Sequence, residues 1–460
     1  MARTSSSLTV FCTIAVLLST TSAIGVNYGG LADNLPPAAT TLSLVKTTSI
    51  NKLKLYDARA DILNAFAGSG IDIIVGAGND QITPLAQDPN AAVQWVAANV
   101  VPYTTTSIVG ICLGNEVLST APALGGLLLP AMQNLHDALV AVGLGEKVKV
   151  SSPHSLSILA VSFPPSAGAV DAQHAEVITP MLQFFTETGA PFMINAYPYF
   201  AYTGNPVNIS LDYALFQPSA PTVKDDSSNL VYTNLFDAQV DAMYAALGKL
   251  GYGTLPITVT ETGWPTAGDA TETAATIANA QLYNSGLIKH IQSGMGTPAK
   301  PNVVLETYIF ALYNENMKAG PVSEQNWGLF LTTGAAVYDS GLNAVPGTVP
   351  TTPAAPGTDV SPSSAPVTGV SWCLAKPDAD PVKLQNGLNF ACSEGKADCV
   401  QISSGSPCFE PNTLVSHASF AYNSYYQINN RNAWDCYFDN TGMIVTVDPS
   451  TPGCKYQGAP

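Results

Sequence analysis

Short apolar, β-rich runs alternate with longer amphipathic stretches through residues 24–342. Such alternation is typical of repeated strand–helix units. The predicted strands are IGVNYG from Ile24, KLKLYD from Lys52, IDIIVGAG from Ile71, IVGICLGNE from Ile108, KVKVSSPH from Lys147, PFMINAYPY from Pro191, LPITVTETGW from Leu255 and LETYIFALYNE from Leu305. Eight units of this kind predict an α/β fold, a (β/α)8 TIM barrel. An open doubly wound sheet is the alternative, but no glycine-rich phosphate loop follows the first strand.

The pattern changes in the last quarter of the chain. Residues 343–370 are rich in Pro, Ser, Thr and Ala, which predicts a linker rather than a core. Residues 371–460 then hold six of the eight cysteines, which are Cys373, Cys392, Cys399, Cys408, Cys436 and Cys454. Only His417 lies among them and close Cys-x-x-Cys pairs are lacking, so disulfides are favoured over a zinc site. We expect a small disulfide-rich α+β module, although spacing alone leaves 15 possible pairings.

Residues 1–23 have the pattern of a secretory signal peptide. Arg3 precedes an apolar stretch over residues 8–18, and small residues end at Ala23, after which cleavage is expected. The stretch is too short to span a membrane, and the C-terminal residues lack the apolar tail of a lipid-anchor signal. We therefore expect a secreted protein of the extracellular space or cell wall, with no membrane anchor.

Charge narrows the range of partners. The chain has 33 acidic and 17 basic residues, a net charge of −16, which argues against nucleic acid as a partner. The five histidines are scattered without metal-ligand spacing, so we expect no metal and no cofactor. We also expect a monomer, with Asn208 of the Asn-Ile-Ser sequon as a glycosylation site.

Ionisable side chains follow the carboxyl ends of three predicted strands, where the active sites of such barrels lie. Glu116 ends the fourth strand, Glu261 lies near the end of the seventh, and Glu315 ends the eighth, with Lys318 and Glu324 close behind. Each Glu could simply cap or salt-bridge a loop. Two carboxylates that face across one cleft, however, are what glycosidic cleavage requires, because one protonates the leaving oxygen while the other attacks or activates water.

Strand alternation supports this pairing. It places Ile257 and Val259 on the same face as Glu261, and Cys112 on the same face as Glu116, both toward the barrel axis. Flat sugar faces stack on aromatic rings, and several aromatic residues lie at the predicted strand ends or just beyond. Aromatic side chains are also common in cores, so each could instead be structural.

The motifs IGVNYGGLADNLP, KLKLYDA, GNEVL, FPPSAG, TETGWPTAG and TYIFALYNENMKAGP make residues 24–342 resemble the plant endo-β-1,3-glucanases of glycoside hydrolase family 17. The resemblance implies that Glu116 is the general acid/base and Glu261 the nucleophile of a retaining double displacement. Its implied supporting residues are Glu315, Lys318, Glu324 and Asn115. Position near the strand ends makes Tyr28, Tyr56, Asp57, Tyr197, Phe200 and Trp264 the expected substrate-binding residues, with Tyr28 and Tyr197 the best candidates by motif. The implied partner is a β-1,3-glucan polysaccharide such as callose or laminarin.

The segments WCLAKP, NFACSEG and RNAWDCYF make residues 371–460 resemble the X8 domain, a carbohydrate-binding module of family 43. The resemblance implies the pairs Cys373–Cys436, Cys392–Cys399 and Cys408–Cys454. The aromatics Tyr422, Tyr425, Tyr426, Trp434 and Tyr437 could form a sugar-stacking surface, and core packing is the competing interpretation.

Three alternatives stay open from the sequence. The protein could be a non-catalytic wall protein that binds glucan, or a transglycosylase that uses the same intermediate and passes the sugar to another sugar. Its substrate could also be mixed-linkage 1,3;1,4-glucan, because the loop positions that distinguish linkages cannot be placed from the sequence.

Overall fold

The structure is a computed structural model that describes residues 23–342 and 371–458, apart from residues 377, 378, 380, 394, 396, 430, 432, 439, 440, 446, 447 and 452. The predicted signal peptide before residue 23 and the predicted linker at residues 343–370 lie outside the described residues. The chain divides into two compact units, and the boundary falls between residues 348 and 349.

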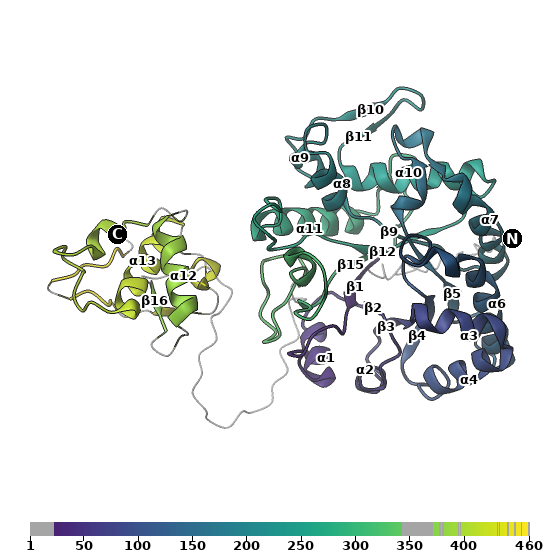
Figure 1. Ribbon diagram of the computed structural model, residues 1–460, viewed down its shortest axis with the longest axis horizontal. Helices are drawn as coiled ribbons and strands as arrows, with labels where there is room; N and C mark the ends of the chain where they lie inside the picture. The colour runs from purple at the N-terminus through teal and green to yellow at the C-terminus, as the bar shows by residue number, and fades with distance from the viewer. Residues whose placement is uncertain are drawn as a thin grey trace, which may run out of the picture. The chain divides into compact units, whose positions relative to one another are not determined.

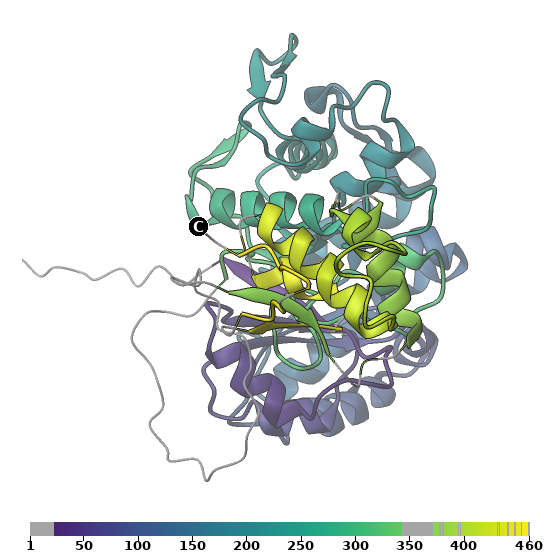
Figure 2. The same cartoon turned by 90° about the vertical axis from the view of Figure 1, so that its left-hand side faces the viewer.

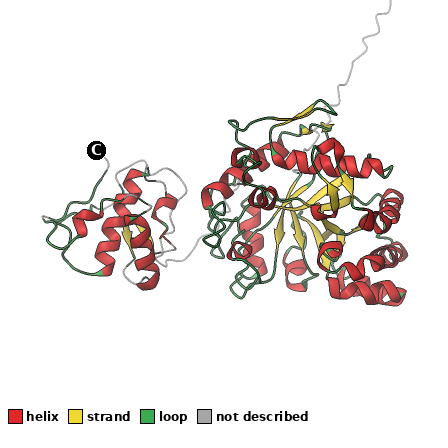
Figure 3. Ribbon diagram, turned by 45° about the horizontal axis from the view of Figure 1, so that its top comes forward, coloured by secondary structure: helices red, strands yellow, loops and turns green. Residues whose placement is uncertain are grey.

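Within residues 23–342, parallel strands gather at the centre of the first unit with helices around them (Figure 1, Figure 3). The strands are β1 (Ile24–Tyr28), β2 (Lys52–Leu55), β3 (Asp72–Ala77), β4 (Ser107–Leu113), β5 (Lys149–Ser151), β6 (Pro153–Ser155), β9 (Phe192–Asn195), β12 (Ile257–Thr262) and β15 (Thr307–Ile309). They pair in the order β5-β4-β3-β2-β1-β15-β12-β9-β6. Since only Ser152 separates β5 from β6, this order closes on itself through the fifth predicted strand. The barrel prediction is confirmed.

Helices follow the strands and cover the outside of the barrel. They are α1 (Ala38–Lys46), α2 (Ala60–Ala65), α3 (Ile82–Gln87), α4 (Pro89–Asn99), α5 (Val117–Thr120), α6 (Gly125–Ala141), α7 (Ala172–Thr188), α8 (Pro198–Gly204), α9 (Leu211–Ala214), α10 (Leu235–Lys249) and α11 (Ile277–Gln292). Side-chain caps define several starts, for example Asn234 at α10 and Thr276 at α11. Gly189 caps the C-terminus of helix α7, and its φ of 67° suits a residue without a Cβ.

The first unit also contains short two-stranded ribbons and 3₁₀ turns. Three two-stranded ribbons pair β7 (Leu159–Val161) with β8 (Ala169–Val170), β10 (Val223–Asp225) with β11 (Leu230–Tyr232), and β13 (Gly296–Thr297) with β14 (Lys300–Pro301). The β10/β11 ribbon projects at the top of Figures 1 and 2. Single 3₁₀ turns are η1 (Asn79–Gln81), η2 (Pro122–Leu124), η3 (Leu156–Ile158), η4 (Pro165–Ala167) and η5 (Val322–Gln325).

Apolar side chains fill two layers of the first unit. The main core lies between the strands and the helices, and it includes the outward-facing Leu53, Leu55 and Ile194. A smaller cluster of Ile74, Cys112, Met193 and Tyr308 fills the barrel interior. The interior is therefore packed, and the polar chemistry is left to the carboxyl ends of the strands.

The second unit is a small module stapled by disulfides. Its elements are β16 (Trp372–Ala375), α12 (Pro381–Cys392), η6 (Cys399–Ile402), α13 (Leu414–Ile428), η7 (Ala433–Cys436) and β17 (Gly442–Val445). Helix α13 packs on α12 and on β16, which pairs antiparallel with β17 (Figure 2). The disulfides are Cys373–Cys436, Cys392–Cys399 and Cys408–Cys454, so the implied pairing is confirmed. Such links stabilise a module whose core is small.

Candidate active site

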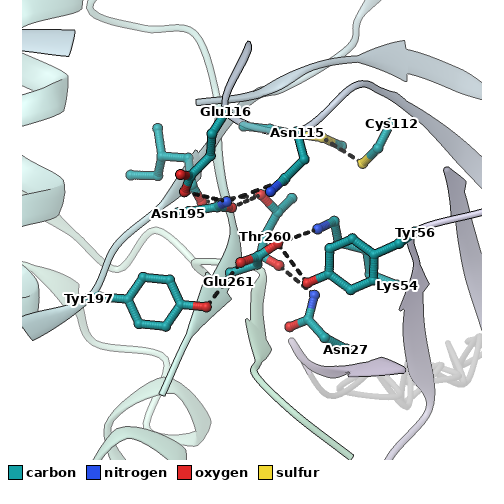
Figure 4. Close-up of polar contacts among 12 residues, drawn as sticks. Asn27, Lys54, Tyr56, Cys112, Asn115, Glu116, Asn195, Tyr197, Thr260 and Glu261 are labelled. Atoms are coloured by element: carbon teal, nitrogen blue, oxygen red, sulfur yellow. Dashed lines mark hydrogen bonds and ion pairs between the residues drawn. The ribbon is translucent and has the colours of Figure 1, made fainter. Parts of the chain in front are cut away.

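A cleft of about 520 Å³ opens at the carboxyl ends of the barrel strands. Glu116, Glu261, Asn115 and Asn195 all line it, and Figure 4 shows the Asn195 side chain between the two glutamates. Further lining comes from Ser155, Leu156, Ser157, Leu159, Ser162, Tyr197, Phe200, Ala201, Gln239, Phe310, Lys318, Glu324 and Trp327. The structure thus brings the two predicted catalytic residues into one site.

A β-bulge turns Glu261 into this cleft. Val259 pairs with Ile194 of β9, whereas the next paired residue, Asn195, meets Glu261, so β12 contains one extra residue here. Ile257 and Val259 pack in the main core with the helices. The predicted alternation was therefore wrong for these two residues: they lie on the opposite face to Glu261, because the bulge reverses the facing of the strand.

Three side chains donate hydrogen bonds to the buried Glu261 carboxylate. Lys54 Nζ lies 2.8 Å and Tyr56 Oη 2.6 Å from Oε1, and Tyr197 Oη lies 2.9 Å from Oε2. Lys54 is 1% exposed, which makes this a buried ion pair. Burial and the charge of Glu261 raise the pKa of both tyrosines well above their ordinary value, so both remain donors.

The pKa of Glu261 is the outcome of two opposing effects. Burial alone would raise it, but the charge and hydrogen bond of Lys54, followed by the hydrogen bond of Tyr56, outweigh burial. The net pKa lies below the ordinary value of a glutamate. Glu261 is therefore held as a carboxylate.

Glu116 lies just beyond β4 in an irregular turn. Gly114 has a φ of 64° and Glu116 itself a φ of 51°, a conformation that is uncommon for a residue with a side chain. Its carboxylate accepts one hydrogen bond, from Asn195 Nδ2 at 2.9 Å. Burial, and then the negative charge of Glu261, raise the pKa of Glu116. The pKa values of the two glutamates are therefore shifted in opposite directions from the ordinary value of a glutamate.

The residues after β15 border the site in two ways. Lys318 forms an ion pair of 2.9 Å with Glu324, and both line the cleft. Glu315 is buried and accepts the Leu31 backbone N–H at 3.0 Å; burial raises its pKa. A Cβ on Gly29 would lie 2.2 Å from the Glu315 carboxyl carbon, so only glycine fits there. Glu315 thus ties the first loop to the last strand.

The predicted substrate-binding residues separate into two groups. Tyr197 and Phe200 line the cleft, and Phe200 is 46% exposed. Tyr56 contacts Glu261, and Asp57 beside it is exposed. Asn115 lines the cleft and accepts from Asn195 Nδ2 at 3.3 Å.

Tyr28 and Trp264 are placed in the core, outside the lining of the cleft. Tyr28 is 2% exposed, with its hydroxyl 3.2 Å from the Thr41 hydroxyl under α1. Trp264 is fully buried, and its Nε1 donates to the Ala274 carbonyl oxygen. A sugar has no access to either ring in this conformation. Both were predicted from their positions near strand ends, which do not distinguish a cleft-facing ring from one under a helix.

Sequence reasoning missed several residues of the site. Lys54 and Asn195 contact the glutamates, and Trp327 and Gln239 line the cleft. A signal existed for Lys54, because a single lysine between Leu53 and Leu55 in a barrel strand needs a buried partner. Trp327 stands in the segment NWGLF after η5, and its place in the sequence does not distinguish a ring that lines the cleft from a ring in the core.

Other predictions concern the surface and the module. Asn208 is exposed between α8 and α9, as glycosylation would need. In the module, Tyr422 and Tyr426 are fully buried in the core, and Tyr437 is 40% exposed. The side chain of Trp434 lies outside the described residues.

Among the residues that the structure describes, no group of three His, Cys, Asp or Glu side chains could hold a metal ion. In the same residues, no helix is both long and apolar enough to cross a membrane.

A (β/α)8 barrel with two glutamates of oppositely shifted pKa at the carboxyl ends of its strands defines a candidate glycosidase. Comparison with known proteins supports that class. Residues 24–341 match the family described as Glycosyl hydrolases family 17, and residues 371–443 match the X8 domain. The chain belongs to glycosyl hydrolase family 17 and is a glycoside hydrolase.

Relatives are similar along most of the chain. Glucan endo-1,3-beta-glucosidase 7 of Arabidopsis thaliana is 46% identical over 95% of this chain and 84% of that protein. Glucan endo-1,3-beta-D-glucosidase of Olea europaea is 43% identical over 95% of this chain and 93% of that protein. The solved structure of CJP38, a beta-1,3-glucanase and allergen of Cryptomeria japonica pollen, has a TM-score of 0.67 and 43% identity, covering 70% of this chain and 99% of that one.

Proposed function

We propose that this protein is a secreted endo-1,3-β-glucanase that works by double displacement with retention. The observation that supports the mechanism is that two glutamates in one cleft have pKa values shifted in opposite directions. The pKa of Glu261 is lowered and the pKa of Glu116 is raised. The relatives named above, which are called endo-1,3-beta-glucosidases, support the linkage. The predicted signal peptide at residues 1–23 supports secretion.

In the first step Glu261 attacks the anomeric carbon while Glu116 gives its proton to the departing glycosidic oxygen. The bond from carbon to that oxygen breaks, and an ester to Glu261 forms. Lys54, Tyr56 and Tyr197 keep Glu261 ionised and aimed before the attack. Because the Glu261 charge raises the Glu116 pKa, the acid starts protonated at a higher pH than an ordinary glutamate.

In the second step the roles reverse. The ester carries no negative charge, so the repulsion that raised the Glu116 pKa is gone. Glu116 then takes a proton from water, whose oxygen attacks the same carbon and releases Glu261. The proton cycle needs no group beyond the two glutamates.

Binding of an extended polymer is supported by the cleft wall. Tyr197, Phe200 and Trp327 lie in contact there, with Tyr197 and Trp327 ring centroids 5.2 Å apart. The half-exposed Phe200 ring is available for stacking on a sugar face.

The X8 module supports a second contact with the same polymer. Phe390 is 42% exposed and packs against the half-buried Tyr425, with ring centroids 5.4 Å apart. An aromatic surface of this kind suits sugar stacking, and tethering would raise the effective concentration of the barrel on insoluble glucan. Phe390→Ala should weaken cosedimentation with insoluble β-1,3-glucan, whereas Val400→Ala, which alters another exposed residue of the module, should not.

Release of reducing sugar from laminarin tests the proposal, with Glu261→Gln as the control. Activity in the parent that is lost in this variant supports it, and size analysis of the products separates hydrolysis from transglycosylation, which gives chains longer than the substrate. A folded parent inactive on laminarin and on mixed-linkage glucan would reject it in favour of a glucan-binding protein.

A further inference from the structure

We propose that Thr260 is a positioning residue for both glutamates: its backbone forms the bulge that presents Glu261, and its hydroxyl orients the Asn195 amide toward Glu116. The idea rests on the proposed roles of the two glutamates. Thr260 is the first residue of the TETGWPTAG motif, from which the sequence implied no role for it, and it lies fully buried in β12.

The backbone half of the proposal follows from the strand register. Toward β15, Val259 pairs with Thr307 and Thr262 with Ile309, so β12 advances three residues while β15 advances two. Together with the shift toward β9, this places the extra residue between Val259 and Glu261, which is Thr260. Asn27 Nδ2 of β1 donates to the Thr260 carbonyl oxygen at 2.9 Å and holds the bulge from inside the barrel.

The side-chain half follows from the amide of Asn195. The Thr260 hydroxyl lies 2.8 Å from Asn195 Oδ1 and 3.2 Å from the Ile194 carbonyl oxygen. Asn195 Nδ2 then faces two acceptors, Glu116 Oε1 at 2.9 Å and Asn115 Oδ1 at 3.3 Å (Figure 4). A reversed amide would set its oxygen against both acceptors, so the hydroxyl donor and the two acceptors favour the same orientation.

Burial makes this orientation depend on Thr260. Asn195 is 3% exposed, so water has little access to replace the hydroxyl. Without that donor, Asn195 Oδ1 would be a buried acceptor lacking a partner, and the amide would be free to turn away from Glu116. The Thr260 side chain therefore controls a hydrogen bond it does not itself make.

That hydrogen bond favours the carboxylate form of Glu116 and lowers its pKa, against burial and the charge of Glu261, which raise it. Lys54 and Lys318 also lower the pKa of Glu116, and Glu324, which is paired with Lys318, lines the same cleft. Tyr197 also lies close by and stays protonated. Support from Asn195 matters most when Glu116 serves as a base, because it must then be ionised.

The test compares Thr260→Val, which keeps the shape but removes the hydroxyl, with Thr260→Ser, which keeps the hydroxyl. Thr262→Val is a matched control, since that threonine hydroxyl on the same strand meets Tyr283 Oη instead. The pKa of Glu116 is measured in the full chain by ¹³C NMR of labelled glutamate carboxyls, assigned with Glu116→Gln. The pH dependence of kcat/KM on laminarin is measured in parallel.

Thr260→Val should raise the Glu116 pKa by about one unit and shift the alkaline limb of kcat/KM upward with it. It should also lower kcat roughly tenfold. Thr260→Ser and Thr262→Val should keep the parental Glu116 pKa. If Thr260→Val does not fold, as judged from its Tm, Thr260→Ala takes its place.

An unchanged Glu116 pKa in the folded variant, or an equal shift in Thr260→Ser, would overturn the proposal. Failure of the proposed function gives a different result. A parent that does not hydrolyse β-1,3-glucan, while Thr260→Val still shifts the Glu116 pKa, would reject the function and keep the positioning role.

Discussion

At the end of β12, Glu261 accepts hydrogen bonds from three side chains, one of them a buried ammonium group. At the end of β4, Glu116 accepts one, from a neutral amide. Glu261 is buried and Glu116 partly buried, so burial alone would raise the pKa of each. The difference lies in Lys54, whose charge adjoins Glu261 directly. One barrel thus shifts the pKa values of two identical side chains in opposite directions by the partners it supplies.

Exchange of either glutamate carboxylate for an amide should have the largest effect on activity. Glu116→Gln should slow hydrolysis of laminarin roughly 10³-fold, because the leaving oxygen loses its acid. The same variant should keep the first step on dinitrophenyl β-laminaribioside, because the dinitrophenolate leaving group needs no proton. Added azide should then restore its turnover of this substrate. Glu261→Gln should lose both activities, because no ester can form. Steady-state rates on the two substrates check this, and azide rescue of Glu261→Gln with the retained anomer would contradict the assigned roles.

Removal of the charge beside Glu261 should have the next largest effect. In Lys54→Met, burial would no longer be offset, so the Glu261 pKa should rise and the acid limb of kcat/KM should move up by about one to three units. Because the folded-state pKa is lowered in the parent, ionised Glu261 stabilises the fold above its ordinary pKa, and this contribution is lost as the pH falls through the folded pKa. The Tm of Lys54→Met should therefore fall most at neutral pH.

Lys52→Met is the matched control for that variant. Lys52 lies two residues earlier in β2 and pairs with Glu306 at 3.1 Å, outside the cleft lining. Its loss should leave the acid limb of the pH profile in place. Equal shifts in both variants would mean that general charge, rather than the contact with Glu261, sets the profile.

The sequence predicted the frame of this comparison well. Short β-rich runs marked every barrel strand, and some of them, such as IDIIVGAG, are the continuous apolar segments that strands buried on both faces need. The motifs around Glu116 and Glu261 pointed to the two glutamates, and both line one cleft in the structure. These features are local in the chain, and local patterns are what a single sequence reports most directly.

The unpredicted features depend on contacts between distant segments. Lys54 meets Glu261 across 207 residues of sequence, and Asn195 meets Glu116 across 79. The bulge at Thr260 leaves no mark in the alternation of ITVTET, so Ile257 and Val259 were assigned to the wrong face. Tyr28 was expected to meet substrate, but it is buried beside Thr41 of α1 and against the ring of the distant Tyr313.

The two tyrosines on Glu261 allow a finer comparison between its two oxygens. Tyr56→Phe should lower kcat roughly tenfold, the cost of one hydrogen bond to a charged group, and raise the acid limb. Tyr197→Phe should shift the limb less, because Tyr56 shares Oε1 with Lys54 and is among the main causes of the lowered pKa. Tyr199→Phe is the control, since its hydroxyl meets Glu272 instead. A larger shift of the acid limb for Tyr197→Phe would mean that the hydrogen bond to Oε2 lowers the Glu261 pKa more than the hydrogen bond from Tyr56 to Oε1.

Lys318 should give the smallest effect and a distinct one, because it acts on both glutamates. It lowers the pKa of Glu116 and of Glu261, each as one of the weaker causes. Lys318→Met should therefore move both limbs of the pH profile upward by a few tenths of a unit without changing their separation. Lys318 is partly exposed and paired with Glu324, so salt should shrink the shift, and Lys318→Arg should abolish it. Movement of one limb alone would show that Lys318 affects the pKa of only one of the two glutamates.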